Sequence, residues 1–251
     1  MKKIFLYILA GSLCFTACKK DGDDTPTYVE PEDIATQNSY DDQSIQKFLD
    51  NNYLDSQGNI KAFSSTDTSD DNEKKLSELN PITLPSGVVY IVRAGAQPED
   101  SSPPVTGTTI GEKDILTILS KTTTYLAANT DGNVAFIAGT SMSGYSPLEG
   151  SGSPFKDPMF YYVKKNVLTS DTSKDKNYYE IEGFQEAIRK FKAFNQDNGA
   201  PYNLQGVIIV PSRAAFARDA HYNYSGYSFR NRSFVFNFQV YKSETRPADQ
   251  E

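Results

Sequence analysis

The fold is decided by residues 206–241, GVIIVPSRAAFARDAHYNYSGYSFRNRSFVFNFQVY. The opening GVIIV is a short apolar run stopped by Pro211, which is typical of a buried β-strand. The closing SFVFNFQVY alternates with period two and places on one face of a strand the side chains of Phe234, Phe236, Phe238 and Val240. The stretch therefore predicts two strands, the second with a strongly aromatic face.

One amphipathic helix is predicted before these strands. Apolar residues recur at helical spacing at Phe184, Ala187, Ile188, Phe191 and Phe194, and Asn198-Gly199 closes the segment. Shorter strands are predicted at 87–93, 114–119, 134–137, 159–163 and 178–181, with 122–127 as a further strand or a continuation. Asp131-Gly132 is a turn signal. We expect an α+β domain in which an antiparallel sheet of five or six strands wraps one central helix.

The length of 251 residues suits one good-sized domain with tails. We expect a signal peptide at 1–17, an acidic tether at 18–40, an extension with short helices at 41–85, the main domain at 86–243 and a C-terminal tail at 244–251. In the extension, Asp42 or Ser44 is a candidate cap for a helix over 45–53, and a second short helix is predicted at 73–79.

The N-terminus has the pattern of a lipoprotein export signal. Lys2 and Lys3 precede the apolar run 4–15, and the run leads into FTAC, which ends at Cys18. Small residues before a cysteine resemble the bacterial lipobox, in which Cys18 is acylated and anchors the chain to membrane lipid. The charged residues 19–24 resemble surface-export signals of Bacteroidetes lipoproteins, although a solvated tether has the same composition. We expect a lipid-anchored protein of the outer membrane, facing the periplasm or the surface.

Composition excludes several classes of function. The chain carries 25 Lys and Arg against 32 Asp and Glu, a net charge of −7, which argues against nucleic-acid binding. A single His and two Cys argue against zinc sites and Ser-His triads, and no phosphate-binding glycine loop is present, so we expect neither metal nor cofactor. Trp is absent, but 16 Tyr and 15 Phe supply aromatic surface.

Four segments, in order, resemble the FKBP-type peptidyl-prolyl cis-trans isomerases. They are DGNV at 131–134, EIEGF at 180–184 with the helix behind it, VPSRAAF at 210–216 and NRSFVFNFQV at 231–240. The resemblance covers residues 86–243 and implies an FKBP-like fold. It also implies X-Pro isomerisation, a rotation with a barrier of about 18–20 kcal/mol. That chemistry needs a dry aromatic pocket fitted to the twisted amide, and no nucleophile.

The resemblance also assigns a pocket. Phe184 stands where the family has a Trp floor, and the implied walls are Ile181, Phe216, Phe236 and either Phe155 or Phe160. Several side chains typical of the family are replaced in this sequence. Phe216 lacks the hydroxyl of the usual Tyr, and Ser120 stands near the place of another Tyr. Ala135 stands near the place of a Phe, and Phe136 stands near the place of an Asp. The same aromatic residues would also serve as ordinary core packing.

Three functions are consistent with these patterns. The first is an isomerase acting on X-Pro bonds of exported polypeptides. The second is the same fold with a decayed pocket, acting as a chaperone or peptide-binding module. The third is a glycan-binding surface lipoprotein, suggested by the loop tyrosines Tyr222, Tyr224 and Tyr227. His221, in the same loop, is expected to be a surface residue without a role.

Overall fold

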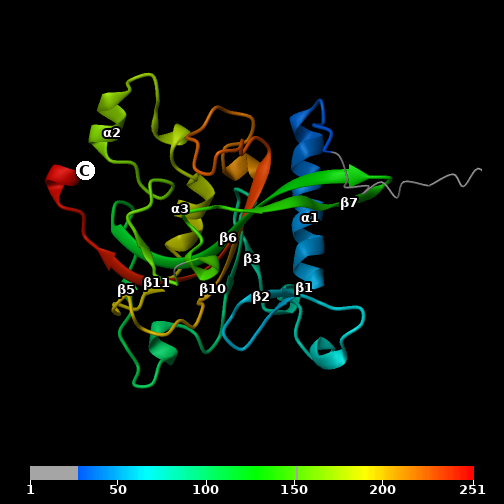
Figure 1. Cartoon of the computed structure of the whole chain (residues 1–251), viewed down its shortest axis with the longest axis horizontal. Coiled ribbons are helices and arrows are strands. Elements are labelled where there is room, and N and C mark those ends of the chain that lie inside the picture. Colours follow the sequence, from blue (N-terminus) through cyan, green and yellow to red (C-terminus); the bar gives the residue numbers. More distant parts are fainter. Residues whose placement is uncertain (1–27, 151) are drawn as a thin grey trace, which may run out of the picture.

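The computed structural model describes residues 28–150 and 152–251 (Figure 1). The predicted signal peptide and the predicted lipidation of Cys18 lie outside these residues. Within the described ranges, none of the helices combines the length and the apolar character that a membrane span requires.

A seven-stranded antiparallel sheet forms the centre of the molecule. Six strands lie in the order β3 (Ile82–Thr83), β4 (Val89–Val92), β10 (Gly206–Val210), β11 (Arg232–Glu244), β6 (Ile115–Thr130) and β7 (Asn133–Ser141), and β8 (Phe155–Lys156) also pairs with β6. Two small sheets join β1 (Asn52–Leu54) to β2 (Ile60–Ala62) and β5 (Thr108–Thr109) to β9 (Lys192–Ala193). The predicted antiparallel α+β class is confirmed, but the expected five or six strands were too few.

Strands β10 and β11, the two strands predicted from residues 206–241, form the middle of the sheet. They pair with Ile208 opposite Phe236, and β11 pairs on its other side with β6. The segments 114–119 and 122–127 belong to the single long strand β6. Asp131 and Gly132 adopt φ angles of 52° and 84° and turn β6 into β7, so the predicted turn is confirmed.

Helix α3 (Glu182–Ile188) is shorter than predicted. The chain leaves the helix after Ile188 and enters β9, although Phe191 and Phe194 are still buried. Gly183 allows the helix to lie against the sheet, because a Cβ atom there would come within 2.7 Å of both Val88 Cγ2 and Val210 Cγ1. The helical spacing of the last two phenylalanines therefore reflected burial rather than helix.

Two predicted strands are wrong. In 159–163 the N–H groups of Tyr161 and Tyr162 both donate to the Pro158 carbonyl, at 3.0 and 3.2 Å, which curls the backbone into a turn. At 178–181 the chain forms a 3-10 turn over Lys176–Tyr178. Residues 160–163 are all buried, so this apolar run marks a segment enclosed on all sides rather than a strand. The helix α2 (Lys165–Ser170) lies between these two segments.

The N-terminal region differs most from its prediction. Helix α1 spans Ile34–Asn51 and is capped by Asp33, whose carboxylate accepts from the Thr36 N–H at 2.7 Å, so Asp42 and Ser44 are interior residues. Before the helix, Glu30 forms a two-pronged ion pair with Arg230 at 2.7 and 2.8 Å. The predicted tether over 18–40 therefore does not hold for residues 28–40. The helix expected at 73–79 is a 3-10 turn, Leu76–Glu78.

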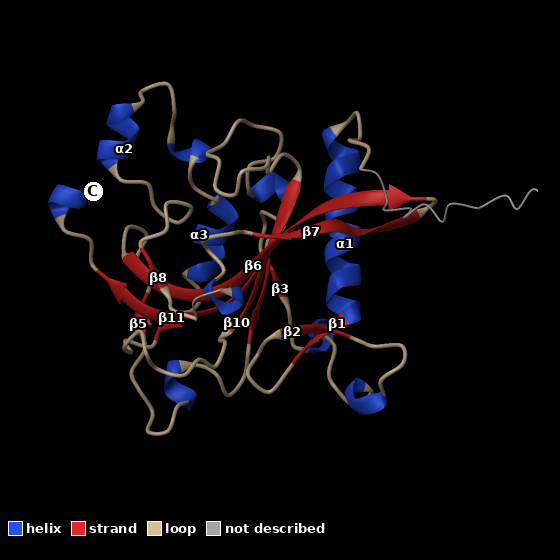
Figure 2. Cartoon of the chain, viewed as in Figure 1, coloured by secondary structure: helices blue, strands red, loops and turns tan. Residues whose placement is uncertain are grey.

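The sheet is covered on both faces (Figure 2). Phe234 and Phe236 point to the face occupied by α3, whereas Val235 points to the opposite face, where Ile45 and Leu49 of α1 pack. We call these the α3 face and the α1 face. The residues predicted as a separate extension, 41–85, thus supply the second layer over the main sheet. The expected C-terminal tail is also attached, because buried Arg246 pairs with Asp157.

Candidate functional site

Four residues of the implied pocket converge on the α3 face. The ring of Phe184 lies 4.3 Å from Phe236 and 5.3 Å from Phe160, and Phe160 lies 5.8 Å from Phe236. Ile181, at the start of α3, belongs to the same cluster. All four side chains are 0% exposed. The structure therefore brings them together, in a closed aromatic core.

Phe155 and Phe216 lie at two different margins of this core. Phe155, on β8, is half-buried with its ring 6.1 Å from Phe160. Phe216 is 2% exposed and its nearest rings are His221 at 4.9 Å and Phe229 at 6.0 Å. It reaches the main cluster through Phe234, at 6.1 Å, and through Tyr224, at 6.5 Å. Phe155 is thus the implied pocket residue that retains an accessible ring.

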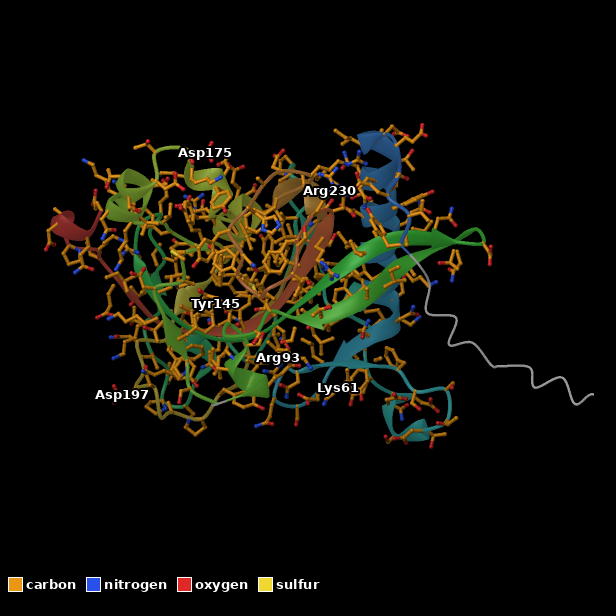
Figure 3. The ribbon with its side chains drawn as sticks, turned by 45° about the horizontal axis from the view of Figure 1, so that its top comes forward. Lys61, Arg93, Tyr145, Asp175, Asp197 and Arg230 are labelled. Carbon is orange, nitrogen blue, oxygen red and sulfur yellow. The ribbon has the colours of Figure 1, made fainter. Side chains whose placement is uncertain are left out.

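Tyr145 closes the cluster and was not anticipated from the sequence. Its half-buried ring packs edge-on against Phe155 and Phe160, each at 5.3 Å, and against Tyr224 at 5.5 Å (Figure 3). Tyr145 lies in a loop after β7 among Gly, Ser and Pro residues, and that composition indicates only a loop. No sequence signal distinguishes it from the other tyrosines.

Hydrogen bonds from β6 fix the loop that carries Tyr145. The Ser120 hydroxyl donates to the Tyr145 carbonyl at 3.0 Å. The Ser146 hydroxyl accepts from the Thr122 N–H at 3.0 Å and donates to the Thr122 carbonyl at 3.1 Å. Ser120 is the residue near the place of a family Tyr, so this departure has a structural consequence. It anchors the loop whose aromatic ring covers Phe160.

The matching positions on β7 do not reach the cluster. Phe136 stacks on Tyr125 at 5.1 Å and meets Phe48 of α1 edge-on at 6.0 Å, on the α1 face. The residue near the place of the family Asp thus supports the helix on the other side of the sheet. An acidic group is absent from that position.

The hydroxyl groups around the cluster stay protonated. Burial raises the pKa of Tyr224, with the neighbouring Tyr145 adding to the effect, and its hydroxyl donates to the Tyr179 carbonyl at 2.6 Å. Burial also raises the pKa of Tyr145, and nearby Tyr222 contributes. Glu180 is buried too, and burial raises its pKa although it accepts from the Val163 N–H at 2.8 Å. The two tyrosines therefore keep neutral hydroxyl groups at ordinary pH.

His221 is a structural residue, contrary to the expectation of a surface residue without a role. Its ring lies between Phe216 at 4.9 Å and Phe229 at 5.3 Å. Nε2 accepts from the Phe229 N–H at 2.9 Å, and Nδ1 lies 2.9 Å from the Tyr222 carbonyl. Since Nε2 accepts, Nδ1 carries the proton and donates. The neutral ring therefore holds the tyrosine-rich loop in place.

Accessible rings remain around the closed cluster. We define the aromatic rim as Tyr145, Phe155, Tyr222 and Tyr227, of which Tyr222 is 37% exposed and the others are half-buried. Tyr222 packs edge-on against Tyr224 at 4.8 Å, and Tyr227 packs against Phe229 at 5.3 Å. Arg232 lies over the Tyr227 ring at 5.1 Å. Rings held in this way offer rigid stacking surface with phenol groups at the edge.

Across the described part of the chain, His, Cys, Asp and Glu form no cluster of three or more suited to a metal ion. The rim itself presents aromatic faces and phenol hydroxyl groups.

Similarity to known proteins is found among solved structures. No protein-family model matches the sequence. A search of curated proteins gives no match either. Among solved structures, FkpA from Escherichia coli is similar at a TM-score of 0.35 with 15% sequence identity. The similarity covers 66% of this chain and 53% of FkpA, so it extends over about half the length of that protein.

Proposed function

We propose that this chain is a polypeptide-binding protein of FKBP-like arrangement that holds proline-containing segments of exported proteins on its aromatic rim. The observation that carries the proposal is the closed cluster beneath that rim. Phe160, Phe184 and Phe236 expose no surface, and Tyr145 packs over Phe160. A proline ring therefore meets the rim and not the pocket that the sequence resemblance implies.

The chemistry of the rim favours such a ligand. Proline and other apolar side chains pack well on aromatic faces, and tyrosines offer large contact areas at a low cost in conformational entropy. Tyr222 and Tyr227 are held by neighbouring rings, so little of their freedom remains to be lost on binding. The sequence resemblance to proline-binding isomerases points to the same class of partner.

Binding is tested with a fluorescein-labelled short X-Pro peptide and fluorescence polarisation. Removing the ring by Tyr222→Ala should weaken binding up to about tenfold, since an aromatic contact contributes about 0.5–1.5 kcal/mol. Tyr202→Ala is the matched control, because Tyr202 lies in another loop with its hydroxyl 3.4 Å from Gln57. Equal affinity of the wild-type and Tyr222→Ala proteins would remove the rim from the proposal.

Isomerisation of X-Pro bonds is the alternative function, and variants of Tyr145 distinguish it from binding alone. The wild-type protein should not accelerate X-Pro exchange, because the twisted amide cannot enter a filled cluster. Tyr145→Ala uncovers Phe155 and Phe160, so this variant should accelerate exchange in a peptide isomerisation assay, whereas Tyr145→Phe should not. Acceleration by the wild-type protein would contradict the binding-only proposal.

Lipid anchoring in the outer membrane through Cys18 is proposed on the sequence pattern alone. Mass spectrometry of the N-terminal fragment from cells should find an acylated Cys18, and Cys18→Ser should release the protein from the membrane fraction. A mature chain that starts elsewhere with a free amine would reject the anchor.

A further inference from the structure

The two edges of the main sheet differ in their protection. At one edge, β3 is two residues long and lies between Pro81 and Pro85, which cannot donate hydrogen bonds. At the other edge, β7 has nine residues, NVAFIAGTS, with neither a charge nor a proline. Natural proteins usually blunt a free edge with those devices or with a β-bulge. In β7 the pairing register with β6 shifts after Ile137 and Ala138 has a φ of 51°, so a bulge protects only its second half. The regular first half, residues 133–137, is suited to pairing with another strand.

The outward groups of β7 follow from its turn. Positive φ angles at both Asp131 and Gly132 indicate a type I′ turn, in which the Asn133 N–H donates to the Thr130 carbonyl. Hydrogen-bonded and non-hydrogen-bonded pairs then alternate along the hairpin. Val134 and Phe136 therefore direct their N–H and C=O groups away from β6. Within the described residues, these groups have no main-chain partner outside the hairpin.

The free edge leads directly to the aromatic rim. The Ser141 carbonyl, at the end of β7, accepts from the Tyr227 hydroxyl at 3.2 Å. The next residues form the loop that carries Tyr145. One face of the hairpin is covered by α1 through Phe48 and Phe136, while its edge projects beside the helix (Figure 1). An extended chain paired with residues 133–137 would therefore lead toward the rim, which lies beyond the bulge at Ala138.

We infer that β7 binds an extended, uncharged and proline-free polypeptide segment as an added strand, next to a proline-containing segment on the rim. Binding of both segments by one polypeptide rests on the proposed function, whereas binding of a strand to β7 does not depend on it. Main-chain amides of the segment would pair with Val134 and Phe136, which requires free N–H groups and excludes proline. Side chains facing α1 would be apolar, because they extend the surface of Phe136.

Three labelled peptides separate the two sites. The first is a short X-Pro peptide, which tests the rim. The second is a proline-free peptide of alternating Val and Thr, which tests β7. The third is the second peptide with alternate amides N-methylated, which cannot pair with a strand. We expect the second peptide to bind and N-methylation to weaken its binding about tenfold or more. Equal binding of the methylated peptide overturns the strand site.

Variants of β7 supply the matched comparison. Val134→Pro removes an outward N–H without removing a bond to β6, and should weaken binding of the Val-Thr peptide about tenfold; Val134→Thr keeps that N–H and should not. If Val134→Pro folds poorly, amide hydrogen exchange on the wild-type protein tests the strand site instead. The Val134 and Phe136 amides should gain protection with the Val-Thr peptide, and unchanged exchange overturns the proposal. If the Val-Thr peptide binds and the X-Pro peptide does not, the proposed binding of proline on the rim is wrong and the strand site on β7 is supported.

Discussion

The two faces of the central sheet are packed in different ways. On the α3 face, aromatic rings interlock around Phe160, Phe184 and Phe236, and none of these is exposed. On the α1 face, a smaller aliphatic cluster is flanked by the half-buried rings of Phe48, Tyr125 and Phe136. A cavity of about 120 Å³ remains there, and it is lined by Phe48, Asn52, Ile60, Lys121, Thr123, Tyr125, Val235 and Asn237. The face that carries the family resemblance is thus the more completely filled of the two.

The difference extends to how each helix is attached. Helix α3 is held by apolar contacts, by the close approach at Gly183 and by partly buried hydrogen bonds of Gln185 and Glu186. Helix α1 adds buried polar bonds: Asp41 accepts from the N–H and the hydroxyl of Ser212 at 2.9 and 2.6 Å, and from Gln37 at 3.0 Å. Polar attachment fixes the position of a helix but tolerates gaps beside it, because its geometry does not depend on filled volume. That is consistent with a cavity on the α1 face.

The largest expected effect comes from removing one ring on each face. Phe184→Ala should lower the free energy of unfolding by about 3–5 kcal/mol, the usual cost for a fully buried Phe. Phe48→Ala should cost about half as much, since its ring is partly exposed and already borders a cavity. Urea unfolding measures both. Equal costs would show that the two faces are equally well packed.

The next effect concerns the polar attachment of α1. Asp41→Ala leaves the Ser212 N–H and hydroxyl without their partner and should cost about 1–3 kcal/mol. Burial raises the pKa of Asp41, and this outweighs the opposing hydrogen bonds from Ser212 and Gln37. The folded protein therefore holds this proton more strongly than the unfolded chain does, so the Asp41 contribution to stability declines as pH rises from about 4 through the raised pKa.

Asp41→Asn isolates that pH dependence because it cannot ionise. Relative to the wild type, Asp41→Asn should gain stability as pH rises across the same window, and the difference should level off above it. Parallel urea unfolding of the two proteins from pH 4 to pH 8 measures the difference. A difference that stays constant with pH would show that the carboxyl titrates alike in the folded and unfolded states.

The contrast between the faces also explains how far sequence reasoning reached. Strands β10 and β11 and the turn at Asp131-Gly132 were predictable, because alternation and turn chemistry are local signals. Helix α1 was placed too late, because the buried side chains before Ile45 are Gln37, Asp41 and Ser44, and a polar run gives no amphipathic pattern. Ser212, the partner of Asp41, is distant in sequence.

The candidate site was predictable only in part. Four of the six residues implied by the resemblance converge, since strand alternation and the start of α3 fix Phe236 and Phe184. Their closure by Tyr145 depends on tertiary bonds from Ser120 and Thr122 to a loop that composition alone leaves undefined. The runs 159–163 and 178–181 were misassigned for another reason: most of their residues are buried in succession, and this hides the period of the backbone.

The smallest expected effect comes from adding one methylene on the α1 face, and the comparison is tested by whether the same change on the α3 face has the opposite sign. Val235 lines the cavity on the α1 face, so Val235→Ile should place its extra methylene in empty space and gain up to about 0.8 kcal/mol. Val210, on the other face, lies where even a Cβ at Gly183 would come within 2.7 Å of its Cγ1. Val210→Ile should therefore cost about 1–3 kcal/mol through overpacking.

Thermal and urea unfolding of the two Val→Ile variants, beside the wild type, measure these changes. Opposite signs for one chemical change follow only if room for a methylene exists on one face and not on the other. A loss of stability in both variants would mean that the α1 face is filled in solution. The packing contrast, and with it the reason that α1 depends on Asp41, would then need another cause.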